Sequence, residues 1–131
     1  MRVLIVDDEP MIVRMMKNYL EDRGFEVTAA ATGREAQRCI AEREYDAAIV
    51  DVRLPDMDGD RFIAAAARTR PWMRFFIHTG SIDYAPSEEL KRLGVDEGSI
   101  IHKPVREMDE IRRMIVRAVN DRRDAGGLDH S

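Results

Sequence analysis

Short apolar runs recur along the chain, separated by segments of mixed polarity. These runs cover residues 3–6, 25–30, 47–50, 75–77 and 100–101. Several are uniformly apolar and do not alternate with polar residues, which is typical of strands covered by helices on both faces of a parallel sheet. The pattern therefore predicts five buried strands.

The segments between the runs have the spacing of amphipathic helices. The i, i+3, i+4, i+7 pattern holds for Ile12, Met15, Met16 and Tyr19, and again for Ile111, Met114, Ile115 and Ala118. Helix starts are indicated at Pro10, at Thr32 with Glu35, and at Asp58, and helix ends at Gly24 and Gly94. Five helices alternating with five strands over short connections favour a doubly wound parallel α/β sheet, because each crossover is right-handed.

The length of the chain fits one domain. A chain of 131 residues buries enough surface to need no disulfide or structural metal, and the single Cys39 cannot close an internal bridge. The last helical pattern fades near Arg123. We therefore expect a domain over residues 1–123, followed by a C-terminal tail or truncated linker over residues 124–131.

Charge and hydropathy narrow the possible partners. There are 21 Lys and Arg residues against 25 Asp and Glu residues, a formal net charge of −4, and a pI near 5.4. This balance argues against direct binding to nucleic acid through overall charge. The apolar runs are far shorter than the roughly 20 residues that cross a bilayer, and no signal-peptide pattern opens the chain. The expectation is a cytoplasmic protein without a membrane partner.

Polar residues that can take part in binding or reaction follow four of the apolar runs. Asp7 and Asp8 follow the first, Asp51 the third, Thr79 the fourth and Lys103 the fifth. In an open α/β sheet, ligands bind at the carboxyl ends of the strands, where the strand order reverses. If the first and third strands are neighbours, the three carboxylates share one pocket.

Three carboxylates in one pocket repel one another unless a cation compensates them. Oxygen ligands of this kind suit Mg²⁺. Lys103 adds a positive charge, and the Thr79 hydroxyl can donate to an anionic oxygen. A carboxylate in such a setting can attack phosphorus, and Asp51 is the expected acceptor because it stands alone after the central run, whereas Asp7 and Asp8 form a pair suited to the metal.

Two histidines precede site residues. His78 and His102 lie directly before Thr79 and Lys103. Because side chains alternate along a strand, we expect both to point away from the pocket and to have structural roles.

Four fragments in order at strand ends carry a family resemblance. They are residues 3–9 (VLIVDDE), 51–59 (DVRLPDMDG), 79–80 (TG) and 103–104 (KP). Through them the chain resembles the receiver domain of bacterial two-component response regulators, over about residues 1–123 and in a single-domain form. The resemblance implies a flavodoxin-like sheet with strand order 2-1-3-4-5.

The resemblance also implies a function. Asp51 would accept a phosphoryl group from a phosphohistidine on a sensor histidine kinase or phosphotransfer protein. Mg²⁺ would be held by Asp7 or Asp8, by Asp51, and by the backbone carbonyl of Arg53. Thr79 would turn towards the phosphoryl oxygens and Lys103 would pair with them.

The expected output is a change in partner affinity. By the resemblance, the surface of the fourth helix, fifth strand and fifth helix would change shape and so alter the binding of a separate downstream protein or the formation of a phosphorylation-dependent dimer. Such a shift requires that the partner bind the two forms unequally. The chemistry is self-assisted, so the protein is not expected to be an enzyme acting on other molecules.

The chain departs from the family pattern at three places. Ile100 stands where the family usually has an aromatic switch residue, so output is expected to rely on loop and helix movement. Residues 95–102 form a longer connection than the common pattern. Arg53 and Ser81 occupy positions that tune the lifetime of the phosphoryl group in the family.

Two other functions are compatible with the same residues. A Mg²⁺-dependent phosphatase of the haloacid dehalogenase type also uses an aspartate nucleophile, but normally has a second acid where this chain has Arg53. A receiver-like docking module that works without phosphorylation would have no need of Asp51, Thr79 and Lys103, and their presence speaks against it.

Overall fold

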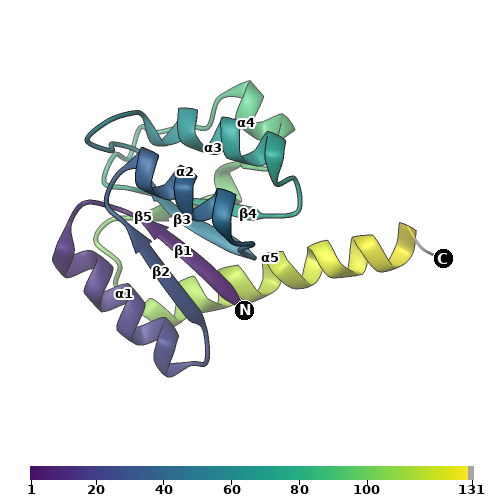
Figure 1. Cartoon of the computed structure of the whole chain (residues 1–131), viewed down its shortest axis with the longest axis horizontal. Coiled ribbons are helices and arrows are strands. Elements are labelled where there is room, and N and C mark those ends of the chain that lie inside the picture. The colour runs from purple at the N-terminus through teal and green to yellow at the C-terminus, as the bar shows by residue number, and fades with distance from the viewer. Residues whose placement is uncertain (130–131) are drawn as a thin grey trace.

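The computed structural model has a five-stranded parallel sheet between two layers of helices (Figure 1). It describes residues 1–129, with side chains as far as Arg122. The strands lie in the order β2-β1-β3-β4-β5, and every pair is parallel. The predicted fold class and the strand order are therefore confirmed.

The strands and helices alternate along the chain as predicted. The strands are β1 (Arg2–Val6), β2 (Glu26–Ala30), β3 (Ala47–Asp51), β4 (Arg74–Thr79) and β5 (Ile100–His102). The helices are α1 (Pro10–Asp22), α2 (Gly33–Glu42), α3 (Gly59–Thr69), α4 (Glu88–Arg92) and α5 (Met108–Asp129), with a 3₁₀ turn, η1 (Glu97–Ser99). Every residue of β3 is buried, which explains why its run has no polar alternation before Asp51.

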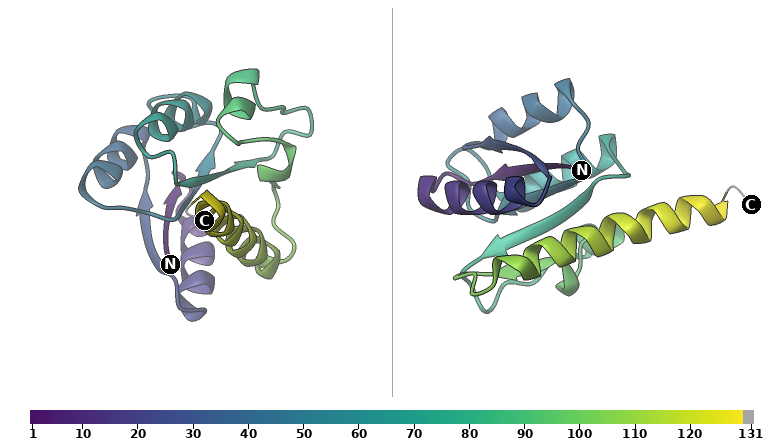
Figure 2. Two further views of the ribbon diagram at one scale, coloured as in Figure 1. Left: turned by 90° about the vertical axis from the view of Figure 1, so that its right-hand side faces the viewer. Right: turned by 90° about the horizontal axis from the view of Figure 1, so that it is seen from below.

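The hydrophobic core has two halves, one on each face of the sheet. Leu4 and Val6 of β1 pack with Phe62 on the side of α2 and α3. Val3 and Ile5 pack with Ile115 on the side of α1 and α5. Figure 2 shows these helix pairs on opposite sides of the strands. Each residue step along β1 therefore changes which helical layer a side chain contacts.

Helix starts follow the predicted local signals. Pro10 occupies the first turn of α1. At α2 the Thr32 hydroxyl accepts a hydrogen bond from the N–H of Glu35 at 3.1 Å, and the Glu35 carboxylate accepts from the N–H of Ala31 at 3.0 Å. Asp58 precedes α3 as its N-cap residue, but its side chain makes no capping hydrogen bond.

The two glycines predicted at helix ends have positive φ angles. Gly24 has φ 88° after α1, and Gly94 has φ 92° after α4. A side chain would be strained in this region, which glycine adopts readily. The chain can therefore turn back towards β2 and towards β5.

The end of α5 differs from the sequence expectation. The helix was expected to fade near Arg123, but it continues to Asp129 and projects beyond the sheet in Figure 1. Helical hydrogen bonds join residues four apart, so a helix can extend where no sheet lies beside it. The interpretation of residues 124–131 as a tail or linker stays a prediction, and residues 130–131 lie outside the described residues.

The long connection before β5 folds as a turn of 3₁₀ helix. Asp96 caps η1 by accepting a hydrogen bond from the N–H of Gly98 at 2.9 Å, while the Ser99 hydroxyl accepts from the N–H of Asp96 at 3.3 Å. The additional length is thus held by local hydrogen bonds. Among the described residues, no helix combines the length and the apolar character needed to cross a membrane.

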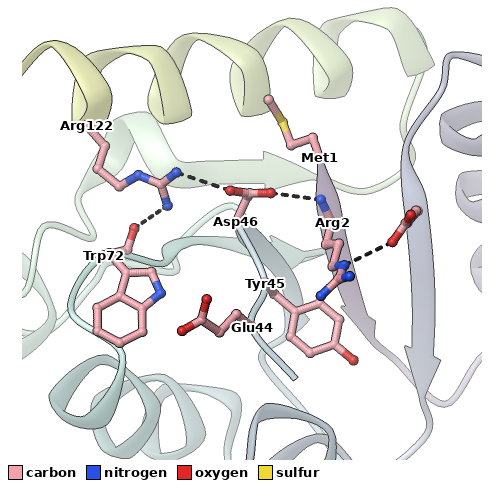
Figure 3. A pocket seen from close by; sticks show the side chains of 8 residues that line it. Met1, Arg2, Glu44, Tyr45, Asp46, Trp72 and Arg122 are labelled. Atoms are coloured by element: carbon pink, nitrogen blue, oxygen red, sulfur yellow. Dashed lines mark hydrogen bonds and ion pairs between the residues drawn. The ribbon is translucent and has the colours of Figure 1, made fainter. Parts of the chain in front are cut away.

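Asp46 joins three elements at the amino edge of the sheet (Figure 3). Its carboxylate accepts hydrogen bonds from the backbone N–H of Arg2 at 2.8 Å and from the Arg122 guanidinium of α5 at 3.1 Å. Arg122 also donates to the carbonyl of Trp72 at 2.7 Å. Burial opposes ionisation of Asp46, but these two donors outweigh it and lower the pKa of the carboxyl. The ionised form of Asp46 is thus stabilised in the folded protein relative to the unfolded chain.

We expect Asp46→Asn to lower the free energy of unfolding by about 2 kcal/mol at neutral pH, because it removes the charge that two donors face. A carboxyl with a lowered folded-state pKa stabilises the protein above its ordinary pKa of 3.8 and loses that contribution as the pH falls through the lowered value. The difference between wild type and variant should therefore shrink in acid. Urea unfolding at pH 7 and pH 3 measures it.

The matched control is Glu44→Gln, since Glu44 is an exposed acid beside the same cluster (Figure 3). It removes one negative charge and should change the stability little. An equal loss in both variants would show that net charge, and not the Asp46 hydrogen bonds, sets the effect.

Candidate functional site

The predicted site residues converge at the carboxyl edge of the sheet. Lys103, directly after β5, places its Nζ atom 3.1 Å from Oδ2 of Asp51 and 3.8 Å from Oδ2 of Asp7. The surrounding cavity has a volume of about 810 Å³, and its lining includes Asp8, Asp51, Arg53, Thr79, Ser81 and Lys103. The edge where β1, β3, β4 and β5 end thus gathers acids, a hydroxyl and an ammonium group in one place.

The three predicted carboxylates form one cluster. Asp7, Asp8 and Asp51 each offer a carboxylate oxygen, and these oxygens lie within 4.8 Å of one another. Asp7 is 3% exposed and Asp51 is 8% exposed, whereas Asp8 is open to solvent. Asp8 and Asp51 therefore line the cavity, and Asp7 is buried beside them.

Asp7 is charged despite its burial. Burial raises the pKa of its carboxyl, but nearby His78, the N–H of Glu9 and the Lys103 ammonium together lower the pKa below its usual value. The Glu9 N–H donates to Oδ1 of Asp7 at 2.9 Å. Asp7 therefore presents an ionised oxygen at neutral pH.

Lys103 is held by carboxylates on two sides. Burial lowers its pKa, but hydrogen bonds to Glu9 and Asp51, each at 3.1 Å, outweigh this effect and raise the pKa above its usual value. Its backbone N–H also donates to the carbonyl of Thr79 at 2.8 Å. Glu9 was not predicted as a site residue, although its place directly after the Asp7–Asp8 pair was the available signal.

The turn after Asp51 is tightly packed. The N–H of Arg53 donates to Oδ1 of Asp51 at 3.1 Å, and the N–H of Gly59 donates to the carbonyl of Val52 at 2.7 Å. A Cβ atom on Gly59 would lie 2.2 Å from the carbonyl oxygen of Asp51, so any side chain there would displace the acceptor strand. Residues 52–58 are thus fixed against the site.

Thr79 and Ser81 lie on the opposite wall of the cavity. Thr79 is buried, and its hydroxyl accepts a hydrogen bond from the N–H of Ser81 at 3.1 Å. Ser81 is exposed and lines the cavity. Ile100, at the predicted switch position, is half-buried at the start of β5 and does not line this cavity, so the structure brings Arg53 and Ser81 to the same cavity as Asp51 but not Ile100.

His78 does not line the cavity, in agreement with its predicted orientation, but it lies beside one of the site acids. Its side chain is 2% exposed, and Nδ1 lies 3.9 Å from Oδ2 of Asp7. Alternation separates His78 from Thr79 as expected, but Asp7 extends from β1 to the same face as His78. Neither ring nitrogen has a hydrogen-bond partner among the described residues. His102 is exposed.

Tyr84 was missed by sequence reasoning. It lies on the loop between β4 and α4, lines the cavity, and donates a hydrogen bond from its hydroxyl to Oδ1 of Asp60 at 2.6 Å. No periodicity or motif includes it, because its role depends on how this loop lies against α3.

Comparison with known proteins agrees with this geometry. The family described as the response regulator receiver domain matches residues 3–116. The transcriptional regulatory protein KdpE of Mycobacterium tuberculosis is 33% identical over 127 residues, which cover 97% of this chain and 54% of that protein. The chain thus spans about half the length of this curated relative.

Solved structures show the same architecture. A CheY-like receiver domain protein from Methanospirillum hungatei superposes with a TM-score of 0.85 at 31% identity, covering 95% of this chain and 97% of the other. The chemotaxis response regulator CheY4 of Vibrio cholerae has a TM-score of 0.77 at 28% identity, covering 89% and 97%. Since the family matches residues 3–116 and a receiver domain superposes over 95% of the chain, the chain belongs to the response regulator receiver domains of two-component signalling.

Proposed function

We propose that Asp51 accepts a phosphoryl group from a phosphohistidine on a sensor histidine kinase or phosphotransfer protein. The observation that carries the proposal is the position of Asp51, a buried carboxylate 3.1 Å from the Lys103 ammonium and beside two further acids at the mouth of a cavity. A carboxylate held in this way is oriented as a nucleophile, and the ammonium offsets the negative charge that a phosphoryl group brings.

The transfer is a simple displacement. An Asp51 carboxylate oxygen forms a bond to phosphorus, the bond from phosphorus to the histidine nitrogen breaks, and its electron pair stays on the imidazole. Lys103, which contacts the free Asp51 carboxylate, then pairs with the phosphoryl oxygens. The Thr79 hydroxyl donates a hydrogen bond to one of these oxygens. Since such a reaction depends mainly on positioning and charge stabilisation, the existing contacts of these two residues favour it.

The acidic cluster fits a divalent cation. Three carboxylates within 4.8 Å, with Glu9 nearby, exceed the one charge that Lys103 supplies. Asp7 or Asp8, Asp51 and the carbonyl of Arg53 would hold Mg²⁺, which prefers such oxygen donors. The bound ion would supply further neutralisation of the transferred phosphoryl oxygens.

Output is proposed to pass to another protein. Phosphorylation would alter the surface formed by α4, β5 and α5, which follows the Thr79 loop and Lys103 along the chain, and so change the affinity for a downstream partner or a second copy of the chain. Because Ile100 replaces the aromatic switch residue, this change would be carried by the loop and helix α4. We propose no turnover of other substrates, since the position after Val52 holds Arg53 and not a second acid.

Incubation with acetyl phosphate and Mg²⁺ should modify Asp51 alone, because its carboxylate contacts the ammonium that offsets the added charge. Peptide mass spectrometry locates the modification. Asp51→Asn should abolish it, and omission of Mg²⁺ should slow it strongly. Modification at Asp7 or Asp8 would contradict the proposal, and steady turnover of a phosphomonoester would instead support a phosphatase.

Arg53→Ala should accelerate loss of the phosphoryl group several-fold. Arg53 is exposed at the rim of the cavity, where its cation can cover the phosphoryl oxygens against water. The decay of protein labelled at Asp51, followed after removal of the donor, measures the rate. Arg53→Lys keeps the charge and serves as the matched control. An unchanged rate in Arg53→Ala would remove this role.

A further inference from the structure

The loop between β4 and α4 is anchored along its exposed part by the side chain of Tyr84. From Gly80 to Ala85 every side chain position is exposed except Tyr84, which is half-buried. The loop nevertheless forms much of one wall of the acceptor cavity, through Gly80, Ser81, Asp83 and Tyr84. What holds Tyr84 therefore also holds this wall.

Tyr84 is fixed at both ends of its side chain. Its ring packs against the hydrophobic core on the side of α2 and α3, and its hydroxyl donates to Oδ1 of Asp60 at 2.6 Å. Burial and the neighbouring Asp60 carboxylate both raise the pKa of Tyr84 above its usual value. The hydroxyl thus stays protonated and can donate throughout the neutral pH range.

The anchor reaches the part of the chain that carries the acceptor. Asp60 lies in the first turn of α3, directly after Gly59, whose N–H bonds to the carbonyl of Val52. The hydrogen bond from Tyr84 to Asp60 therefore links the wall that follows Thr79 to the turn that follows Asp51. The link therefore joins a residue that lines the cavity to the helix that follows the Asp51 turn.

We propose that Tyr84 is a positioning residue that holds the β4–α4 loop against α3 as a wall over the acceptor cavity and so limits the access of water to phosphorylated Asp51. This inference rests on the proposed function. In the step that it slows, a water oxygen forms a bond to phosphorus, the bond to the Asp51 oxygen breaks, and the carboxylate leaves with the electron pair. The water proton passes to solvent, and inorganic phosphate is released.

The test compares loss of the phosphoryl group in wild type, Tyr84→Phe and Tyr84→Ala. Tyr84→Phe removes only the hydroxyl, and it should accelerate hydrolysis about fivefold, the scale of one hydrogen bond. Tyr84→Ala also removes the ring and should accelerate it further. Asp60→Ala combined with Tyr84→Phe should add little to either single change, because both remove the same contact.

Tyr19→Phe is the matched control. The Tyr19 hydroxyl donates to Oδ1 of Asp109 at 2.7 Å, the same kind of bond, but it joins α1 to α5 and does not line the cavity. It should leave the hydrolysis rate unchanged. An equal acceleration in Tyr19→Phe would attribute the effect to general loosening and overturn the proposal.

A second measurement separates access of water from distortion of the site. Beryllofluoride bound with Mg²⁺ mimics the phosphoryl group and needs no attacking water, so its affinity should be the same in wild type and Tyr84→Phe. Faster hydrolysis with unchanged affinity supports the proposal, whereas an unchanged rate, or a parallel loss of affinity, overturns it. If wild type gains no phosphoryl group on Asp51, the proposed function itself fails, which is a distinct result.

Discussion

The contact between the Lys103 ammonium and the buried carboxylates of Asp7 and Asp51 is the interaction on which this site depends. Burying two like charges side by side is unfavourable, and a lone pair of acids would hold a proton. Lys103 contacts both carboxylates, and together with the backbone N–H of Glu9 it lowers the pKa of Asp7. The same arrangement leaves an excess of negative charge that a divalent cation can balance. The proposed nucleophile, metal ligands and counter-charge thus follow from one electrostatic requirement.

The sheet meets this requirement through its topology. Because β1 and β3 are neighbours and β4 and β5 follow, the ends of four strands deliver their polar residues to one edge. The buried residues of the two core halves include none of the acids, the hydroxyl or the lysine of the site. At the opposite edge of the sheet, Asp46 joins β1 to α5 through hydrogen bonds to Arg2 and Arg122. The length of β3 separates it from Asp51. The charged site residues therefore stand at the carboxyl ends of the strands, and the apolar residues of the strands form the core.

The walls of the cavity differ in how they are held. The turn after Asp51 is fixed by close backbone packing at Gly59, which leaves no room for a side chain. The loop after Thr79 is instead held by side chains, chiefly by Tyr84 on Asp60. A backbone constraint resists change, whereas a single hydrogen bond of about 1 kcal/mol can be broken and remade. This asymmetry places the adjustable wall on the side of α4, where the proposed output surface begins.

Local patterns in the sequence were enough to determine the strands, several helix limits, and the residues at the strand ends, because burial on both faces and the rules of helix capping act over a few neighbouring residues. Asp7, Asp51 and Lys103 could be identified in this way. Three contacts could not be identified in this way: the ion pair of Glu9 with Lys103, the approach of His78 to Asp7, and the hydrogen bond of Tyr84 to Asp60. Each joins segments that are distant in the chain and depends on how loops and strand ends face one another. The continuation of α5 to Asp129 was also missed, because helical hydrogen bonds persist where the apolar pattern that reports on packing has already stopped.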